Sequence, residues 1–347
     1  MFEMFIKTTN RKLDKSTNQQ KENGLARLNH ASLFFLFTLS FLLLTTGCTK
    51  RVKVEFRRFE RMLFTSTEST MASHRAEYDS ELINFYPDDP SYMDDLREYI
   101  NDSVVRYIYR VSDSMYHDLS DVEEQLSKAL TRAGKLYPEL RKYDRFYTLV
   151  TADYENYNYR IFCNDHELAV AIDQYAVGQM DRYGYFGLPH YIIGLCTREH
   201  IAPDCMAAIA DTHKEWPKGQ PTLLDCAISE GKTLYFLEKT MPDVPDTILL
   251  RYTADQLAWM EGNVEQVWTW LIDNEMLFST DYNKLRNLMD DAPKTNAFGD
   301  GSAPRTPSYI GWQIVRRYMK KNKKVTMEQL LKETDSRKIL TESGWRP

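Results

Sequence analysis

The stretch LFFLFTLSFLLLTTGC, residues 33–48, determines the compartment in which the rest of this chain folds. Its first twelve residues are almost wholly apolar and follow a leader with Lys and Arg, and an apolar run of this length is too short to span a bilayer. The Gly-Cys pair that follows offers a cleavage site and, at Cys48, a thiol that can be lipidated. We therefore predict a lipoprotein signal peptide over 1–47 and a mature chain that begins at lipidated Cys48. Thr45 stands where a strict bacterial lipobox has Leu, Val or Ile, so plain secretion or an uncleaved anchor stays open as an alternative.

Composition indicates a folded and acidic protein. The chain has 347 residues, of which 43% are hydrophobic and 13% aromatic, enough for a full core in one or two domains. Its formal net charge is −6, and the leader carries more basic than acidic residues, so the remainder is more acidic still. A chain of this charge is not suited to binding nucleic acid over a broad surface, and we expect no nucleic-acid partner.

Four cysteines follow Cys48, and their spacing fits no common metal site: Cys163, Cys196, Cys205 and Cys226. In an oxidising compartment a Cys196–Cys205 or a Cys163–Cys226 bridge is possible. An even number of cysteines is thin evidence, and buried free thiols are favoured.

The sequence predicts an α+β fold that is mostly α-helical. We expect a tether and lead-in segment over 48–90 and a single globular domain over 91–347, with a helical part at 91–136, a sheet and loop at 137–194 and a second helical part at 195–347. Apolar residues recur at three- and four-residue steps in the helical parts.

Three short runs rich in Tyr, Val and Ile predict strands at Arg145–Val150, Tyr157–Cys163 and Glu167–Ile172. Because they follow one another closely, we expect a small antiparallel sheet. A Gly/Tyr-rich segment, Tyr175–Gly194, comes next and reads as a long irregular loop, which is more often functional than a short one.

Two helix starts in the C-terminal part are well marked. Thr253 and Gln256 form a capping-box signature ahead of an apolar helical face. Thr306 and Pro307 open another helix, since proline is favoured in the first turn.

The familiar catalytic motifs are incomplete. His166-Glu167 begins like the zinc-protease HExxH, but Val170 replaces the second histidine. Gly231-Lys232-Thr233 ends like a phosphate-binding P-loop, but Cys226 replaces the opening glycine. Three histidines near acidic residues are weak candidates for a metal site, because their spacing matches no usual ligand pattern: His190, His200 and His213.

Glu230 is the weak candidate for a catalytic residue. It stands on a helical face that is otherwise apolar, where an isolated charge costs several kcal/mol unless it is paired or protonated. One interpretation is an acid/base or metal-binding carboxylate; the favoured one is an internal pair with Arg251 or Arg316. The adjacent Gly231 costs about 1 kcal/mol in a helix relative to Ala, which a close contact with another segment would explain.

Two basic segments are candidate contact sites. Lys50, Arg51 and Lys53 follow the predicted lipid and suit anionic headgroups, although a soluble linker is equally compatible. Six of the nine residues 316–324 are basic, which favours interaction with a helix dipole and leaves a docking surface as the alternative.

Four elements of the C-terminal half stand out: an EGK on a helix, a YTxxQLxW helix start, a late STD, and a GWQIVRxYM followed by a basic turn. In their order and spacing they resemble the gliding-motility lipoprotein B family (GldB) of Bacteroidetes. The residues that match the family motifs are Glu230, Gly231, Lys232, Tyr252, Trp259, Asp281, Gly311, Trp312, Gln313 and Arg316.

The resemblance implies a cell-envelope lipoprotein, in the outer membrane or on the periplasmic face of a membrane, associated with the gliding apparatus and with type IX secretion. Its partners would be the membrane, through Cys48, and envelope proteins of a motility or secretion complex. A structural or assembly role without cofactors is favoured over catalysis. The family is also remotely similar to zincin-like metallopeptidases, in which case Glu230 would be the remnant of a metal ligand. The alternatives are a divergent hydrolase centred on Glu230 and a peptide- or glycan-binding module that uses the aromatic-rich loop.

Overall fold

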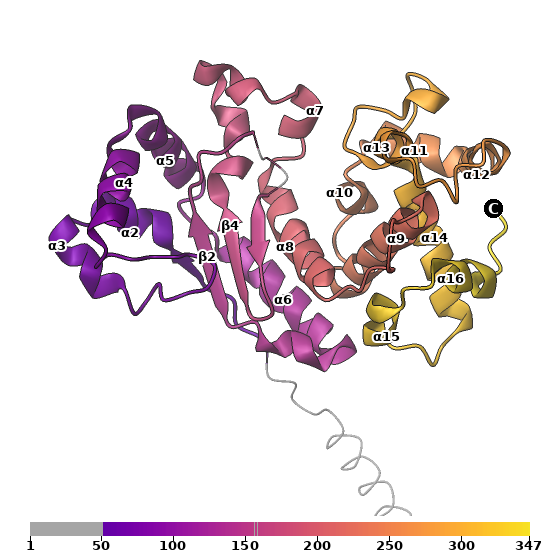
Figure 1. Ribbon diagram of the computed structural model, residues 1–347, viewed down its shortest axis with the longest axis horizontal. Helices are drawn as coiled ribbons and strands as arrows, with labels where there is room; N and C mark the ends of the chain where they lie inside the picture. The colour runs from indigo at the N-terminus through magenta and orange to yellow at the C-terminus, as the bar shows by residue number, and fades with distance from the viewer. Residues whose placement is uncertain (1–50, 156, 158) are drawn as a thin grey trace, which may run out of the picture. The chain divides into compact units, whose positions relative to one another are not determined.

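The computed structural model describes residues 51–347 except 156 and 158, and they form a mostly helical structure around a small mixed sheet (Figure 1). The strands are β1 (Phe56–Arg58), β2 (Arg145–Leu149), β3 (Ile161–Cys163) and β4 (Glu167–Ala171), in the order β1-β2-β4-β3. Strands β1, β2 and β4 run parallel, and only β3 is antiparallel to its neighbour β4. The expected antiparallel sheet was therefore wrong.

A tight turn explains the mixed topology. The Asn164 side chain accepts hydrogen bonds from the backbone N–H groups of His166 and Glu167, at 3.0 and 2.8 Å, and folds β4 back against β3. Because β4 then lies between β3 and β2, the strands β2 and β3, which follow each other in sequence, do not pair. Strand β1 was missed because its residues, Phe-Arg-Arg, show no apolar alternation.

The sheet separates two hydrophobic clusters. Tyr147 and Ala169 face the smaller one, under the helices drawn on one side of the sheet, whereas Phe146 and Leu168 face the main core. The first helices are α2 (Phe59–Thr65), α3 (Glu68–Met71), α4 (Pro90–Asn101), α5 (Ser103–Met115) and α6 (Ser120–Leu136). The last three of these account for the helical part expected at 91–136.

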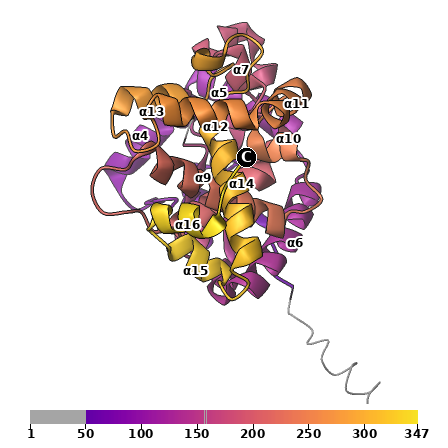
Figure 2. The ribbon, with the colours of Figure 1, turned by 90° about the vertical axis from the view of Figure 1, so that its right-hand side faces the viewer.

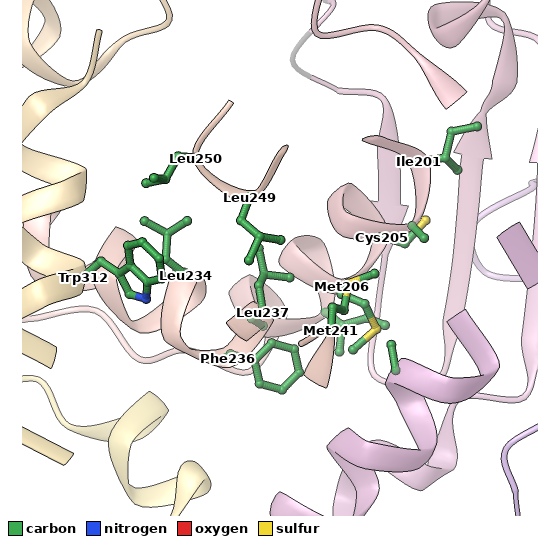
Figure 3. Close-up of a cluster of buried hydrophobic side chains, with 14 of the residues drawn as sticks. Ile201, Cys205, Met206, Leu234, Phe236, Leu237, Met241, Leu249, Leu250 and Trp312 are labelled. Atoms are coloured by element: carbon green, nitrogen blue, oxygen red, sulfur yellow. The ribbon is translucent and has the colours of Figure 1, made fainter. Parts of the chain in front are cut away.

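The main core continues away from the sheet into the C-terminal helices. Figure 3 shows apolar side chains where α8, α9, α10 and α14 meet, among them Met206, Leu237, Leu249 and Trp312. The helices after the sheet are α7 (His190–Ile193), α8 (Arg198–Thr212), α9 (Leu223–Thr240), α10 (Asp246–Leu250), α11 (Ala254–Gly262), α12 (Val264–Asp273), α13 (Tyr282–Met289), α14 (Thr306–Lys321), α15 (Met327–Lys332) and α16 (Ser336–Ser343). Within the part of the chain described, no helix is long and apolar enough to cross a membrane.

Hydrogen bonds hold the first described residues against the rest of the fold. The compact unit begins at Arg51, so most of the segment expected as a tether and lead-in, 48–90, belongs to the fold. Alternate backbone N–H groups donate to side chains one helical turn apart on α6: Val52 to Thr131 at 3.0 Å, Val54 to Ser127 at 3.0 Å and Phe56 to Glu123 at 2.8 Å. An extended segment is thereby held along the helix before it enters the sheet as β1.

Two glycines allow α9 and α14 to cross at backbone contact (Figures 1 and 2). A Cβ atom on Gly231 would lie 2.3 Å from the backbone carbon of Gly311, and one on Gly311 would lie 1.8 Å from the carbonyl oxygen of Ala227. No side chain fits in that space. The close contact expected at Gly231 is confirmed, and its counterpart is the glycine of the GWQ motif.

We expect Gly231→Ala to lower the free energy of unfolding by about 3 kcal/mol, because the added methyl group must push two backbones apart. The matched control is Gly262→Ala at the exposed end of α11, where nothing lies within 4 Å of the new Cβ atom and helix propensity should add about 0.5 kcal/mol. Urea unfolding followed by circular dichroism measures both. Equal stability of the two variants would contradict the proposed role of the crossing.

Candidate functional site

A polar cleft of about 450 Å³ opens between the edge of the sheet and the C-terminal helices. We call it the β3 cleft. One wall comes from β3 and the residue before it, the second from α8, and the third from α9 and the end of α10. The residues that line it include Arg160, Ile161, Cys163, Asp204, Glu230, Arg251, Asp291 and Arg305.

Asp204 on α8 is the centre of the charges in this cleft. Arg251 donates a hydrogen bond to one carboxylate oxygen, the Tyr175 hydroxyl donates to the other at 2.8 Å, and Arg160 lies 3.7 Å away. Burial alone would raise the pKa of Asp204, but the two guanidinium groups hold it below its ordinary value. Asp204 is therefore ionised near neutral pH and interacts with side chains on several sides. It is suited to holding helices and strands together and not to exchanging protons.

Two arginines of the cleft have a left-handed backbone. Arg251 follows α10 with φ 59° and Arg305 precedes α14 with φ 46°, a region that costs a residue with a side chain about 1 kcal/mol or more. Arg305 donates to the Leu250 carbonyl at 3.0 Å and lies 3.5 Å from Asp291. This conformational cost indicates that the two guanidinium groups have a role, since glycine would adopt the same backbone without it.

Glu230 lies on the α9 wall of the cleft and is half-buried. Its carboxylate forms neither a hydrogen bond nor an ion pair with the described residues. The expected pairing with Arg251 or Arg316 was wrong, because Arg251 pairs with Asp204 and Arg316 pairs with Glu238 at 2.6 Å. The sequence pattern placed the carboxylate on an inward face but could not show that this face borders a cleft.

Comparison with known proteins identifies the family of this chain. A family model described as gliding motility protein GldB matches residues 47–347. The chain belongs to the GldB family. Neither the curated proteins nor the solved structures include a match. The motif resemblance is thus confirmed over nearly the whole chain and supports a gliding-motility-associated lipoprotein, whereas the remoter likeness to zincin metallopeptidases finds no support.

Several GldB motif residues join α9 to the helices that follow it in the C-terminal part. The Trp312 ring nitrogen donates to Glu238 at 3.1 Å, and Arg316 stacks over the Trp312 ring at 3.8 Å. Lys232 is buried and donates to the Glu333 carbonyl; burial and the nearby Lys214 lower the pKa of its amine to about 8. The EGK and GWQ motifs therefore describe mainly how two helices fit, with Glu230 as the member that faces the cleft.

The other motif residues of the GldB chain have local roles. Asp281 caps α13 by accepting the backbone N–H of Asn283 at 3.0 Å, and the capping box at Thr253 and Gln256 is confirmed. Trp259 packs against Phe298 with ring centroids 6.0 Å apart. Tyr252 is buried and donates to the Arg305 carbonyl at 3.4 Å, while Gln313 is half-buried on α14.

The three candidate metal-binding histidines do not converge. His190 packs against the Tyr185 ring, His200 bonds the Thr197 hydroxyl at 2.8 Å, and His213 lies edge-on to Tyr137. Within residues 51–347, apart from 156 and 158, no group of three His, Cys, Asp or Glu side chains is arranged to hold a metal ion. Cys48, the predicted lipidation site, lies outside the described residues.

The four later cysteines are free thiols. Burial raises the pKa of each thiol, so they are neutral near pH 7. Cys163 and Cys196 still contribute polar contacts near the cleft: Cys196 accepts from Arg160 at 3.1 Å, and Cys163 lies 3.4 Å from the Tyr143 hydroxyl.

His200 gives a pH test of the cleft environment. Burial, with Arg251 and Arg160 nearby, lowers the pKa of His200 to about 4 even though Asp204 opposes the shift. The unfolded chain therefore binds more protons between that value and the ordinary histidine pKa, and the free energy of unfolding falls as pH is lowered through this window. Between pH 7 and pH 4, we expect the free energy of unfolding of the natural chain to fall by about 2–3 kcal/mol more than that of His200→Gln. Urea unfolding at each pH measures both proteins. Parallel pH profiles would contradict this assignment.

Proposed function

We propose that this GldB-family protein is a lipid-anchored component of the cell envelope that assembles protein partners of the gliding machinery, and of the type IX secretion system with it. The family match supports the association with gliding motility. An assembly role is favoured over catalysis because Asp204, at the centre of the β3 cleft, interacts with three side chains that come from separate elements.

The observation that carries the proposal is the short connection between Cys48 and the fold. Val52 is already bonded to Thr131 on α6, so only three residues separate it from Cys48. Four residue steps span at most about 14 Å between Cα atoms. A lipid on Cys48 would therefore keep α6 and β1 within a short distance of the membrane surface, where Lys50, Arg51 and Lys53 can meet anionic headgroups.

Two further surfaces are available for partners. In the Tyr175–Gly194 segment, residues 184–187 have a left-handed backbone, and Phe186 stacks on Tyr154 with ring centroids 4.2 Å apart. In the basic turn at 316–324 the side chains of four lysines are exposed: Lys320, Lys321, Lys323 and Lys324. We propose both as contact surfaces for envelope proteins or headgroups.

Removal of the anchor tests the proposal. We expect Cys48→Ser to move the protein from the membrane fraction to the soluble envelope fraction and to abolish gliding in a gliding strain that lacks its own copy, with thermal unfolding unchanged. Cys226→Ser, which alters a half-buried thiol in the body, is the control and should keep both membrane association and gliding. Retention of Cys48→Ser in salt-washed membranes would contradict the lipid anchor.

The length of the connection can be tested separately. A 20-residue Gly-Ser linker inserted after Lys50 adds a root-mean-square reach of about 25 Å without removing the lipid. We expect the protein to remain in the membrane fraction while gliding speed falls at least about twofold. The same linker placed after Lys218, within the exposed residues 218–220, controls for the insertion itself. Full gliding with the linker after Lys50 would show that close attachment is not required.

A further inference from the structure

Strand β3 is an edge of the sheet, and the direction of its backbone groups follows from its pairing with β4. Ala171 donates its N–H to the Arg160 carbonyl at 2.9 Å, and Asn164 donates its N–H to the Glu167 carbonyl at 3.1 Å. In an antiparallel pair such bonded positions alternate with positions whose N–H and C=O groups point away from the partner strand. Ile161 and Cys163 occupy these alternate positions and direct their backbone groups outward.

The two residues that carry these outward groups, Ile161 and Cys163, line the β3 cleft, and both are half-buried. Among the backbone hydrogen bonds of residues 51–347, with 156 and 158 set aside, none uses the outward N–H or C=O of either residue. Proteins usually cover or pair such an edge, because unpaired strand groups attract another strand. Here two residues of the edge strand line a cleft of about 450 Å³, a volume typical of ligand sites.

The charged residues around the cleft indicate which kind of ligand side chain it would bind. Asp204 is paired with Arg251, Asp291 lies 3.5 Å from Arg305, and Asp211 lies 2.7 Å from Lys214. Glu230 alone among the acidic side chains lining the cleft has no partner in the described structure. Arg160 shares Asp204 with Arg251, so the charges of the cleft are close to balanced as a whole, and Glu230 is the lining acid whose carboxylate is left for an incoming cation.

We propose that the β3 cleft binds an extended peptide segment of a partner protein, which adds to β3 as a further strand and places a basic side chain against Glu230. The main chain of the peptide pairs with the outward groups of Ile161 and Cys163, as in other cases of strand addition. Alternate side chains of the peptide face the apolar residues Leu234 and Leu237 on α9. The inference rests on the proposed assembly role and names the class of partner.

Synthetic peptides test this directly with the full chain in mild detergent. The probe is a capped, fluorescent heptapeptide of alternating valine and lysine, compared by fluorescence anisotropy with a version in which glutamate replaces lysine and with one N-methylated at alternate residues. We expect the lysine peptide to bind at least tenfold more tightly than the glutamate peptide. We expect no binding of the N-methylated peptide, because it cannot pair as a strand.

Variants then locate the bound peptide. Ile161→Pro removes the outward N–H without touching a bond to β4, and it should weaken binding at least tenfold, whereas Ile161→Val should leave it unchanged. Glu230→Gln should weaken binding of the lysine peptide about fivefold or more, whereas Glu265→Gln, an exposed acid on α12, should not. Circular dichroism and thermal unfolding verify that each variant is folded.

Amide hydrogen exchange provides a readout that does not depend on variants. We expect the Ile161 and Cys163 amides to become protected when the lysine peptide is bound. Absence of binding at 1 mM peptide, equal binding by Ile161→Pro, or dimerisation of the chain through β3 would each overturn the proposal. None of these outcomes bears on membrane attachment, which the Cys48→Ser experiment measures by itself.

Discussion

The backbone contact between α9 and α14 is the constraint on which the C-terminal half depends. Gly231 and Gly311 leave no space for a Cβ atom, so the two helices have a single way to pack at this point. That packing fixes the rotation of α9. It directs Glu230 toward the cleft, while Lys232 is buried and bonds the Glu333 carbonyl. One pair of glycines therefore determines which charged side chain of the EGK motif is accessible.

Asp204 plays the corresponding part between the sheet and the helices. Arg160 directly precedes β3, Tyr175 ends the 3₁₀ turn after β4, and Arg251 follows α10, so a single carboxylate on α8 joins three other segments. A buried ion pair adds little net stability compared with apolar packing, but removing one partner costs about 3–5 kcal/mol because a charge is left uncompensated. The network is better understood as fixing the positions of the cleft walls than as a source of stability.

Local sequence patterns predicted the local structure well. The capping box at Thr253 and Gln256, the strands at Arg145 and Glu167 and the close approach at Gly231 all depend on neighbouring residues, and each is confirmed. The parallel pairing of β2 with β4 and the existence of β1 depend on which distant segments meet, which no local pattern records. For the same reason the sequence offered Arg251 or Arg316 as the partner of Glu230, and it could not show that Asp204 and Glu238 take these two guanidinium groups.

The loss of that partner changes the meaning of Glu230. A carboxylate paired with Arg251 would be a structural element, whereas a half-buried carboxylate without a partner carries part of the cost of desolvation and gains no internal contact in return. The outward backbone groups of Ile161 and Cys163 likewise have no hydrogen-bond partner in the described structure. The left-handed backbone at Arg251 and Arg305 is a further local cost, in conformational energy. All of these residues line one cleft, and natural sequences concentrate such locally unfavourable choices where a function requires them. The proposed lipid on Cys48 would add a further constraint, because at most about 14 Å of chain separates the Cα atom of Cys48 from that of Val52, which is bonded to α6.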